Sequence, residues 1–167
     1  MHPRRRLLLA GASLALGAFG ARVGAQPAGG AEHLQPVDDL REVLAQVRQQ
    51  RAPLLVLFST PGCPYCLEVR RNYLAPRVAE QAGLPVPTVL IREVDITSRV
   101  ALVDAQGRRI TQAEFAGQFG VRVVPVVALF DARLQLLGDP LVGIDRSGFY
   151  EAYLARAIET ARQRLRS

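Results

Sequence analysis

Tryptophan and lysine are absent from this 167-residue chain, which has only two cysteines, two histidines and one methionine. Without lysine, the chain cannot use a lysine nucleophile or Schiff base. The histidines are His2 and His33, both near the N-terminus, so no other Cys or His is available to complete a tetrahedral zinc site with the two cysteines. We therefore expect neither a metal site nor an organic cofactor.

A long apolar run is also missing. Residues 7–21 are apolar and uncharged, but they are fewer than the roughly 20 that a bilayer-spanning helix needs. A basic segment, His2 to Arg6, precedes them, and Val23-Gly24-Ala25 follows as a small-residue cleavage site. This pattern predicts an export signal over residues 1–25 and a periplasmic mature protein without a membrane span. The general and the twin-arginine export routes both stay open, and an uncleaved anchor is the alternative.

Positive charge is scarce outside that signal. The formal net charge of the whole chain is +6, but the signal contains Arg4, Arg5, Arg6 and Arg22 and no acidic residue. The rest of the chain is therefore close to neutral, which argues against nucleic acid as a partner.

The chemistry-bearing stretch is Cys63-Pro64-Tyr65-Cys66, which lies between an apolar run at 54–58 and a helix-like stretch from Leu67 onward. A helix N-terminus lowers the pKa of a thiol placed there and favours the nucleophilic thiolate. A second thiol three positions later can then resolve a mixed disulfide. A structural role explains the pair poorly, because so short a loop hardly constrains the unfolded chain. We predict thiol–disulfide exchange, with Cys63 attacking and Cys66 resolving.

One domain is expected over residues 37–167, after a flexible leader at 26–36 that is rich in Gly, Ala, Pro and Gln. Hydrophobic periodicity and capping residues predict its elements. A helix capped by Asp38-Asp39 comes first. Strands at 54–58 and 88–96 follow, with a helix between them that Pro76 kinks or splits. Two short strands around a turn at 104–107 precede a helix from Thr111 with a capping box to Glu114. Next are a strand after Pro125, a hairpin over 134–144, and a C-terminal helix that Ser147 caps. The apolar side of that helix carries Phe149, Tyr153, Leu154, Ala157, Ile158 and Ala161.

Pro125 stands inside the apolar run 121–131, although proline is normally confined to the start or the edge of a strand. One explanation is a cis peptide bond that leaves the backbone polar groups of Val124 free to pair with an incoming chain.

These features together resemble the thioredoxin superfamily. The likeness covers roughly residues 37–165, and three motifs carry it. They are the Cys motif between strand and helix, the segment Phe119-Gly120-Val121-Arg122-Val123-Val124-Pro125, which is similar to the family's Tyr-Gly-Ile-Arg-Gly-Ile-Pro with its cis-proline, and Gly143 before the last helix. The resemblance implies an α/β fold, with a central mixed β-sheet flanked by helices and Pro125 facing the thiols. It also implies that Pro125 and Val124 hold the substrate, and that Pro64 and Tyr65 set the reduction potential.

The departures from the family are informative. Leu57 occupies the place of the buried carboxylate of thioredoxins, and Glu93 falls about where they have a lysine. Glu93 is therefore either a proton acceptor near Cys66 or a solvent-facing strand residue. The motif centre, Pro64-Tyr65, is that of glutaredoxins, and the tryptophan that precedes the motif in thioredoxins is missing. An export signal combined with a longer segment at 97–118 resembles exported bacterial thioredoxins of the SoxW type.

The expected function is a periplasmic reductase of protein or small-molecule disulfides that a membrane electron donor keeps reduced. We expect a monomer, since no third cysteine is present to link two chains. The enzyme alternatives are a disulfide-introducing oxidase and a glutaredoxin-like exchanger. A rival from another class is a non-catalytic binding module or chaperone that grips partner chains near Pro125.

Overall fold

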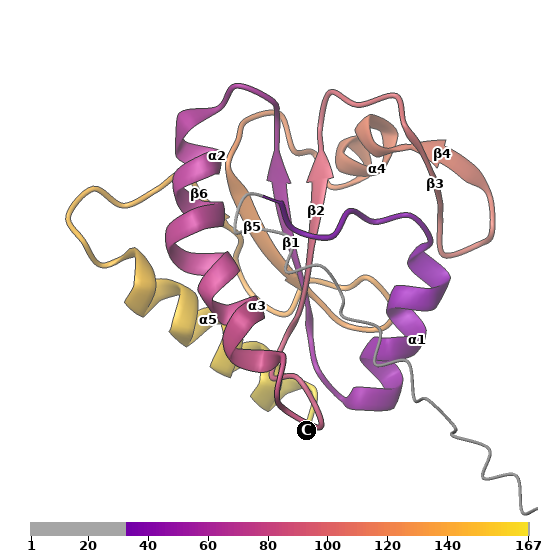
Figure 1. Cartoon of the computed structure of the whole chain (residues 1–167). Helices are drawn as coiled ribbons and strands as arrows, with labels where there is room; N and C mark the ends of the chain where they lie inside the picture. Colours follow the sequence, from indigo (N-terminus) through magenta and orange to yellow (C-terminus); the bar gives the residue numbers. More distant parts are fainter. Residues whose placement is uncertain (1–32, 167) are drawn as a thin grey trace, which may run out of the picture.

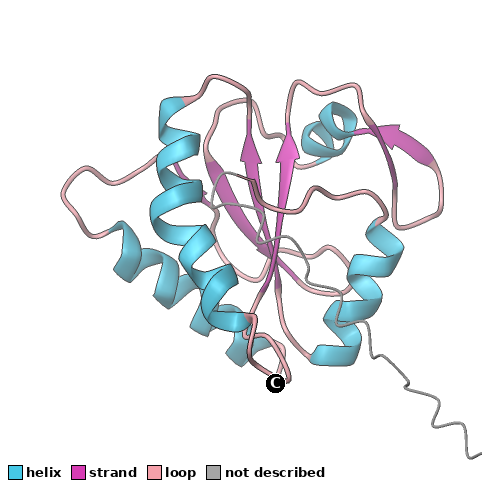
Figure 2. Cartoon of the chain, viewed as in Figure 1, coloured by secondary structure: helices cyan, strands magenta, loops and turns pink. Residues whose placement is uncertain are grey.

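The computed structural model describes residues 33–166, so the expected export signal and residues 26–32 of the leader lie outside the described part of the chain. A four-stranded sheet in the order β2-β1-β5-β6 forms the centre, with helices on both faces (Figures 1 and 2). β1 (Leu54–Ser59) runs parallel to β2 (Leu90–Asp95) and antiparallel to β5 (Val126–Phe130), and β5 pairs antiparallel with β6 (Leu141–Val142). The mixed sheet that the sequence predicted is confirmed.

β1 is the central element, and all six of its residues are buried. Its side chains alternate between the two faces of the sheet. Leu54, Val56 and Phe58 pack into one core with α1 (Leu40–Gln50) and α4 (Gln112–Gln118), whereas Leu55 and Leu57 pack into a second core with the helices of the other face. A continuous apolar run of strand length is the sequence signature of a strand covered on both faces.

The helix after the Cys motif is divided, as predicted. α2 (Pro64–Val69) passes into a π-helical turn, η1 (Arg70–Leu74), and the chain resumes as α3 (Ala75–Gln81). The division stands directly before Pro76, which has no N–H to continue the hydrogen-bond ladder and whose ring crowds the preceding turn. The two cysteines thus lie at the start of a long but interrupted helical segment that packs across the sheet.

The segment between β2 and β5 contains the predicted pair of short strands and the predicted helix. β3 (Ala101–Val103) and β4 (Arg109–Thr111) form an antiparallel hairpin, and Gly107 has φ +81 in its turn. Thr111 and Glu114 form a capping box at the start of α4. The backbone N–H and the hydroxyl of Thr111 lower the pKa of the Glu114 carboxyl by donating to its charged form.

The predictions for the C-terminal region were partly wrong. No strand forms at 134–137, where a single bridge joins Leu136 to Phe130, and β6 pairs with the start of β5. Ser147 does not cap the last helix, α5 (Tyr150–Arg164). Instead Asp145 accepts hydrogen bonds from the backbone of Ser147 and Phe149 before the helix begins.

The predicted apolar face of α5 is confirmed for Leu154, Ile158 and Ala161, which are buried. Phe149 and Tyr153, which were predicted on the same face, are exposed, and Tyr150 is buried instead. Burial raises the pKa of the Tyr150 phenol, because the interior disfavours the phenolate. Periodicity alone could not tell which aromatic residues at the start of the helix are buried, because aromatic residues stand there on more than one side of it.

The end of the segment expected to be a flexible leader lies against the sheet. Leu34 is buried, and Pro36 bridges to Glu93 in parallel fashion. The backbone N–H of Glu93 donates to the carbonyl of Gln35 over 2.9 Å, and the N–H of Val37 donates back to Glu93 over 3.3 Å. Residues 33–36 therefore add a short strand-like edge beside β2, and the prediction of flexibility does not hold for them.

Candidate active site

The two cysteines form a disulfide at the carboxyl end of β1. Their Cα atoms lie 5.3 Å apart, within the normal range for a disulfide. A tight turn, in which Gly62 has φ +76, carries the chain from β1 into the motif, and a left-handed residue there favours glycine. The sulfur of Cys63 is the N-cap acceptor of α2 and receives the backbone N–H of Cys66 over 3.1 Å.

The two sulfur-bearing residues differ in exposure. Cys63 is partly exposed, whereas Cys66 is 0% exposed and belongs to the core beneath the helix. An incoming group can therefore reach Cys63 and not Cys66. The N–H of Cys66 is thus directed at the sulfur that an incoming group can reach.

Pro125 lies at the same end of the sheet. The Val124–Pro125 peptide bond is cis, as the sequence suggested, and β5 begins with the next residue, Val126, which pairs with Phe58 near the end of β1. The carbonyl of Pro125 accepts the N–H of Gly143, but no hydrogen bond joins the backbone of Val124 to another residue that the structure describes. A backbone donor and acceptor thus stay available beside the motif.

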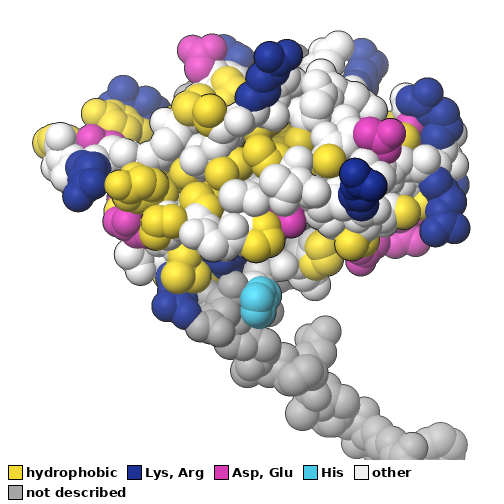
Figure 3. Space-filling view, turned by 90° about the horizontal axis from the view of Figure 1, so that it is seen from above, with side chains coloured by type: hydrophobic (Ala, Val, Ile, Leu, Met, Phe, Trp, Pro, Cys, Tyr) yellow, Lys and Arg dark blue, Asp and Glu magenta, His cyan; other side chains and the backbone are white. Residues whose placement is uncertain are grey.

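Exposed apolar side chains stand in the motif and next to the proline segment. Tyr65, Val123 and Val142 are 42%, 61% and 66% exposed. Seen from above, apolar side chains gather across the middle of this end of the molecule, and arginines lie around them (Figure 3). Arg146, from the loop before α5, donates to the hydroxyl of Tyr65 over 3.2 Å and so joins that loop to the motif.

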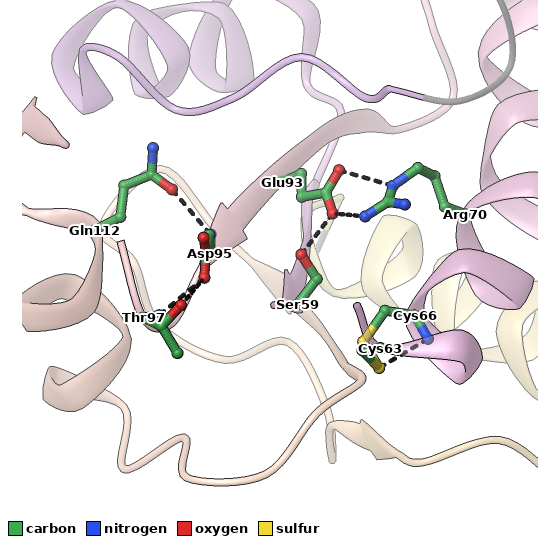
Figure 4. Close-up of polar contacts among 8 residues, drawn as sticks. All are labelled: Ser59, Cys63, Cys66, Arg70, Glu93, Asp95, Thr97 and Gln112. Atoms are coloured by element: carbon green, nitrogen blue, oxygen red, sulfur yellow. Dashed lines mark hydrogen bonds and ion pairs between the residues drawn. A yellow bond between two sulfur atoms is a disulfide. The ribbon is translucent and has the colours of Figure 1, made fainter. Parts of the chain in front are cut away.

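A buried ion pair lies on the other side of β1 (Figure 4). Glu93 on β2 accepts two hydrogen bonds from the guanidinium of Arg70 and one, of 2.5 Å, from the hydroxyl of Ser59. The side chains of Arg70 and Glu93 are only 15% and 14% exposed. The solvent-facing alternative for Glu93 is therefore wrong. Glu93 pairs in register with Leu57 of β1. Its carboxylate therefore lies next to the position at which thioredoxins carry a buried carboxylate and this chain has a leucine.

The sequence analysis missed Arg70, Ser59, Asp95 and Gln112. Arg70 follows Cys66 by four residues and Cys63 by seven, a spacing that puts all three on one face of a helix. That spacing could have identified Arg70 as a partner for a carboxylate on the neighbouring strand. Asp95 is placed there by the pairing of β2 with β1, in register with Ser59, whereas Gln112 reaches the motif only through the packing of α4 against β2.

Within residues 33–166, no group of three or more His, Cys, Asp or Glu side chains is placed to hold a metal ion. No helix in this part of the chain combines the length and the apolar character that crossing a bilayer requires.

Comparisons with known proteins agree with this architecture. Residues 40–154 match the family model of the thioredoxin-like domain. Among curated proteins, none matches the chain. Solved structures of similar fold include the following two. One is a DsbH oxidoreductase, at 16% identity and TM-score 0.52, over 79% of this chain and 88% of that one. The other is a thioredoxin-fold protein from Helicobacter pylori, at 18% identity and TM-score 0.50, over 74% of this chain and 84% of that one.

The family match covers well over half of the chain, and the Cys63–Cys66 disulfide lies within it at the start of α2. The chain therefore belongs to the thioredoxin-like family, and it is a thiol–disulfide oxidoreductase.

Proposed function

We propose that this protein is a periplasmic reductase of disulfides. The observation that supports it best is the asymmetry of the pair, because Cys63 is accessible and capped by a backbone N–H whereas Cys66 is fully buried. A thiolate at Cys63 attacks one sulfur of the substrate and displaces the other as a thiolate, which takes a proton. Cys66 then attacks the Cys63 sulfur, the second substrate thiol leaves, and the protein ends as the disulfide while the substrate has gained two electrons.

The proline segment is the proposed grip on the substrate backbone. Val124 offers an unpaired backbone N–H and carbonyl, and Pro125 holds that segment at the start of β5. An extended substrate can pair there as an added strand beside Cys63. Pro64 and Tyr65 contact the same substrate from the start of α2, and Tyr65 is held by Arg146.

Glu93 is the proposed proton acceptor when Cys66 attacks. Its carboxylate lies on β2, and its partner Arg70 is one helical turn after Cys66. Arg70 and Ser59 both donate hydrogen bonds to the Glu93 carboxylate, so accepting a proton requires this cluster to loosen. Replacing Glu93 with Gln is expected to slow resolution of the mixed disulfide by Cys66 and to leave the first attack by Cys63 unchanged. Trapping the mixed disulfide in rapid-mixing experiments separates the two steps.

Periplasmic location rests on residues 1–25 and is part of the proposal. In a bacterial host, N-terminal sequencing of the protein recovered from the periplasm is expected to begin at Gln26. Recovery of the intact chain from the cytoplasm would contradict it. In the oxidising periplasm a reductase needs a membrane electron donor, and the SoxW-type thioredoxins that the sequence resembles are the proposed relatives of this system.

The reduction potential of the Cys63–Cys66 pair tests the direction of electron flow. The protein is equilibrated against defined dithiol buffers, and the free thiols are trapped. A value near that of thioredoxin, about −270 mV, is expected for a reductase, whereas a value toward about −120 mV would make the protein a disulfide donor. Cys63→Ser is the control, because a non-catalytic binding module would keep its function in this variant and an exchanger would lose all of it.

A further inference from the structure

A groove of about 580 Å³ adjoins the disulfide on the β2 side of β1, whereas Pro125 lies on the β5 side. Cys63 and Pro64 line the groove from the motif, and the segment 33–36 lines it from the strand-like edge beside β2. Its polar side chains include Glu93 and Asp95 of β2, Arg70 of η1 and Gln112 of α4, and His33, Ser59 and Thr60 also line it. Cys63 therefore has two approaches, one past the proline segment and one through this groove.

Three polar atoms of the groove have no partner among the described residues. Arg70 donates to Glu93 through Nε and Nη2, which leaves Nη1 (Figure 4). Gln112 is only 6% exposed and accepts the N–H of Asp95 through Oε1 over 2.8 Å, which leaves its amide nitrogen. Asp95 accepts two bonds from Thr97 through Oδ1, which leaves Oδ2. The residues lining the groove therefore have one unused guanidinium donor, one unused amide donor and one unused carboxylate oxygen, and Cys63 lines the same groove.

We infer that this groove binds a small disulfide with α-amino-acid ends, of the chemical class of cystine. This inference rests on the proposed function and names a substrate for the same pair. The α-carboxylate of one end is received by the side-chain amide of Gln112, and the α-ammonium group is received by the neighbouring Asp95 (Figure 4). A charge-assisted hydrogen bond is about twice as strong as a neutral one, so both ends of such a ligand are selected. The volume of the groove lies within the range of about 300–1,000 Å³ that small-molecule sites have.

The reaction is a complete exchange. The Cys63 thiolate attacks the sulfur of the bound half, the disulfide bond of the ligand breaks, and the distal half leaves as a thiolate that is protonated from water. Cys66 then attacks Cys63 and releases the bound half. The protein dithiol is oxidised to the disulfide and the ligand is reduced to two thiols, so two electrons are transferred and no other reactant is needed for this half-reaction.

The test uses three disulfides that differ only in their ends. Cystine has an ammonium group and a carboxylate at each end, cystamine has only the ammonium groups, and 3,3′-dithiodipropionate has only the carboxylates. The whole protein is reduced, freed of reductant and mixed with each disulfide, and oxidation of the Cys63–Cys66 pair is followed by thiol trapping. Each rate constant is divided by that of mercaptoethanol with the same disulfide, because the leaving thiols differ in intrinsic reactivity.

The corrected rate constant is expected to be at least about tenfold higher for cystine than for either single-charge compound, as one charge-assisted hydrogen bond would give. Asp95→Asn keeps an oxygen for Thr97 and removes the charge, so it should lower the ratio of cystine to dithiodipropionate about tenfold. Asp139→Asn is the matched control, since Asp139 is exposed and lines a different groove beside α5. It should leave the ratio unchanged.

Gln112→Glu provides a second variant that acts on the other end of the ligand. It keeps an oxygen for the N–H of Asp95 and replaces the amide donor by a carboxylate, so it should lower the rate for cystine relative to cystamine. Equal corrected rates for the three disulfides, or equal loss in the Asp95 and Asp139 variants, would overturn the inference. If neither these compounds nor a protein disulfide such as that of insulin oxidises the pair, the proposed function itself fails.

Discussion

The two flanks of the disulfide differ in which groups are buried and which are exposed. On the β2 flank, an ion pair is buried, with Glu93 held by Arg70 and Ser59 at a side-chain exposure of 14%. On the β5 flank, apolar side chains such as Val123 are exposed, and the backbone of Val124 is unpaired. Burying unpaired polar groups costs free energy, and exposing apolar ones gains nothing for the fold.

This difference indicates how stability and binding are divided around Cys63. On the β2 flank, the buried side chains hold one another in place. Substitutions there should therefore change the stability of the fold as well as the rate of disulfide exchange. On the β5 flank, the apolar side chains are exposed and the backbone of Val124 is unpaired. Substitutions there should therefore change the binding of partners and leave the stability of the fold unchanged. The predictions below test this division, from the largest expected effect to the smallest.

Arg70→Met is expected to give the largest loss of stability. It leaves the Glu93 carboxylate largely buried with only Ser59 as a partner, and breaking a buried ion pair costs about 3–5 kcal/mol. Urea denaturation measures the free energy of unfolding. Arg162→Met is the control, because it breaks an exposed pair with Glu159 and should cost less than about 1 kcal/mol. Equal losses in the two variants would remove the distinction between the flanks.

A double variant sharpens the same prediction. Combining Arg70→Met with Glu93→Gln removes the charge, and most of the lost stability should then return at neutral pH.

Val123→Ser and Val142→Ser test the open flank. Both side chains are more than 60% exposed, so each substitution should change the free energy of unfolding by no more than about 0.5 kcal/mol. If protein substrates dock here, the KM for a protein disulfide should rise several-fold while the reduction potential stays the same. The matched change is Val100→Ser, which is equally exposed but lies before β3. A rise in KM with Val100→Ser as well would indicate that this flank is not a specific surface.

The sequence predicted most of the fold because the signals it uses are local. The apolar run 54–58, the capping box at Thr111 and the division before Pro76 each follow from neighbouring residues, and each is confirmed. The C-terminal helix start was wrong because Asp145, not Ser147, supplies the acceptor, from outside the helix itself. Two aromatic residues, Phe149 and Tyr153, gave the same periodicity as a buried face but lie on the surface.

Only the site residues that a local sequence pattern marks could be predicted. Cys63 and Cys66 were evident from their spacing, and Pro125 from its place in an apolar run. The partners of Glu93 come from β1 and η1, and Gln112 comes from α4, so only the tertiary packing reveals them. The ordered segment 33–36 was missed for the same reason, since its hydrogen bonds go to β2 and not to its own neighbours.

Tyr65→Phe is expected to give the smallest effect. It removes only the hydrogen bond from Arg146, which spans 3.2 Å between exposed groups, and a bond of this kind contributes about 0.5–1.5 kcal/mol at most. Stability should fall by less than that, because the loop keeps the bonds from Ser147 and Phe149 to Asp145. The informative measurement is the reduction potential: if the arginine stabilises the Cys63 thiolate through the tyrosine hydroxyl, Tyr65→Phe and Arg146→Ala should lower it equally. A shift with Arg146→Ala alone would show that the charge acts on the sulfur without the tyrosine.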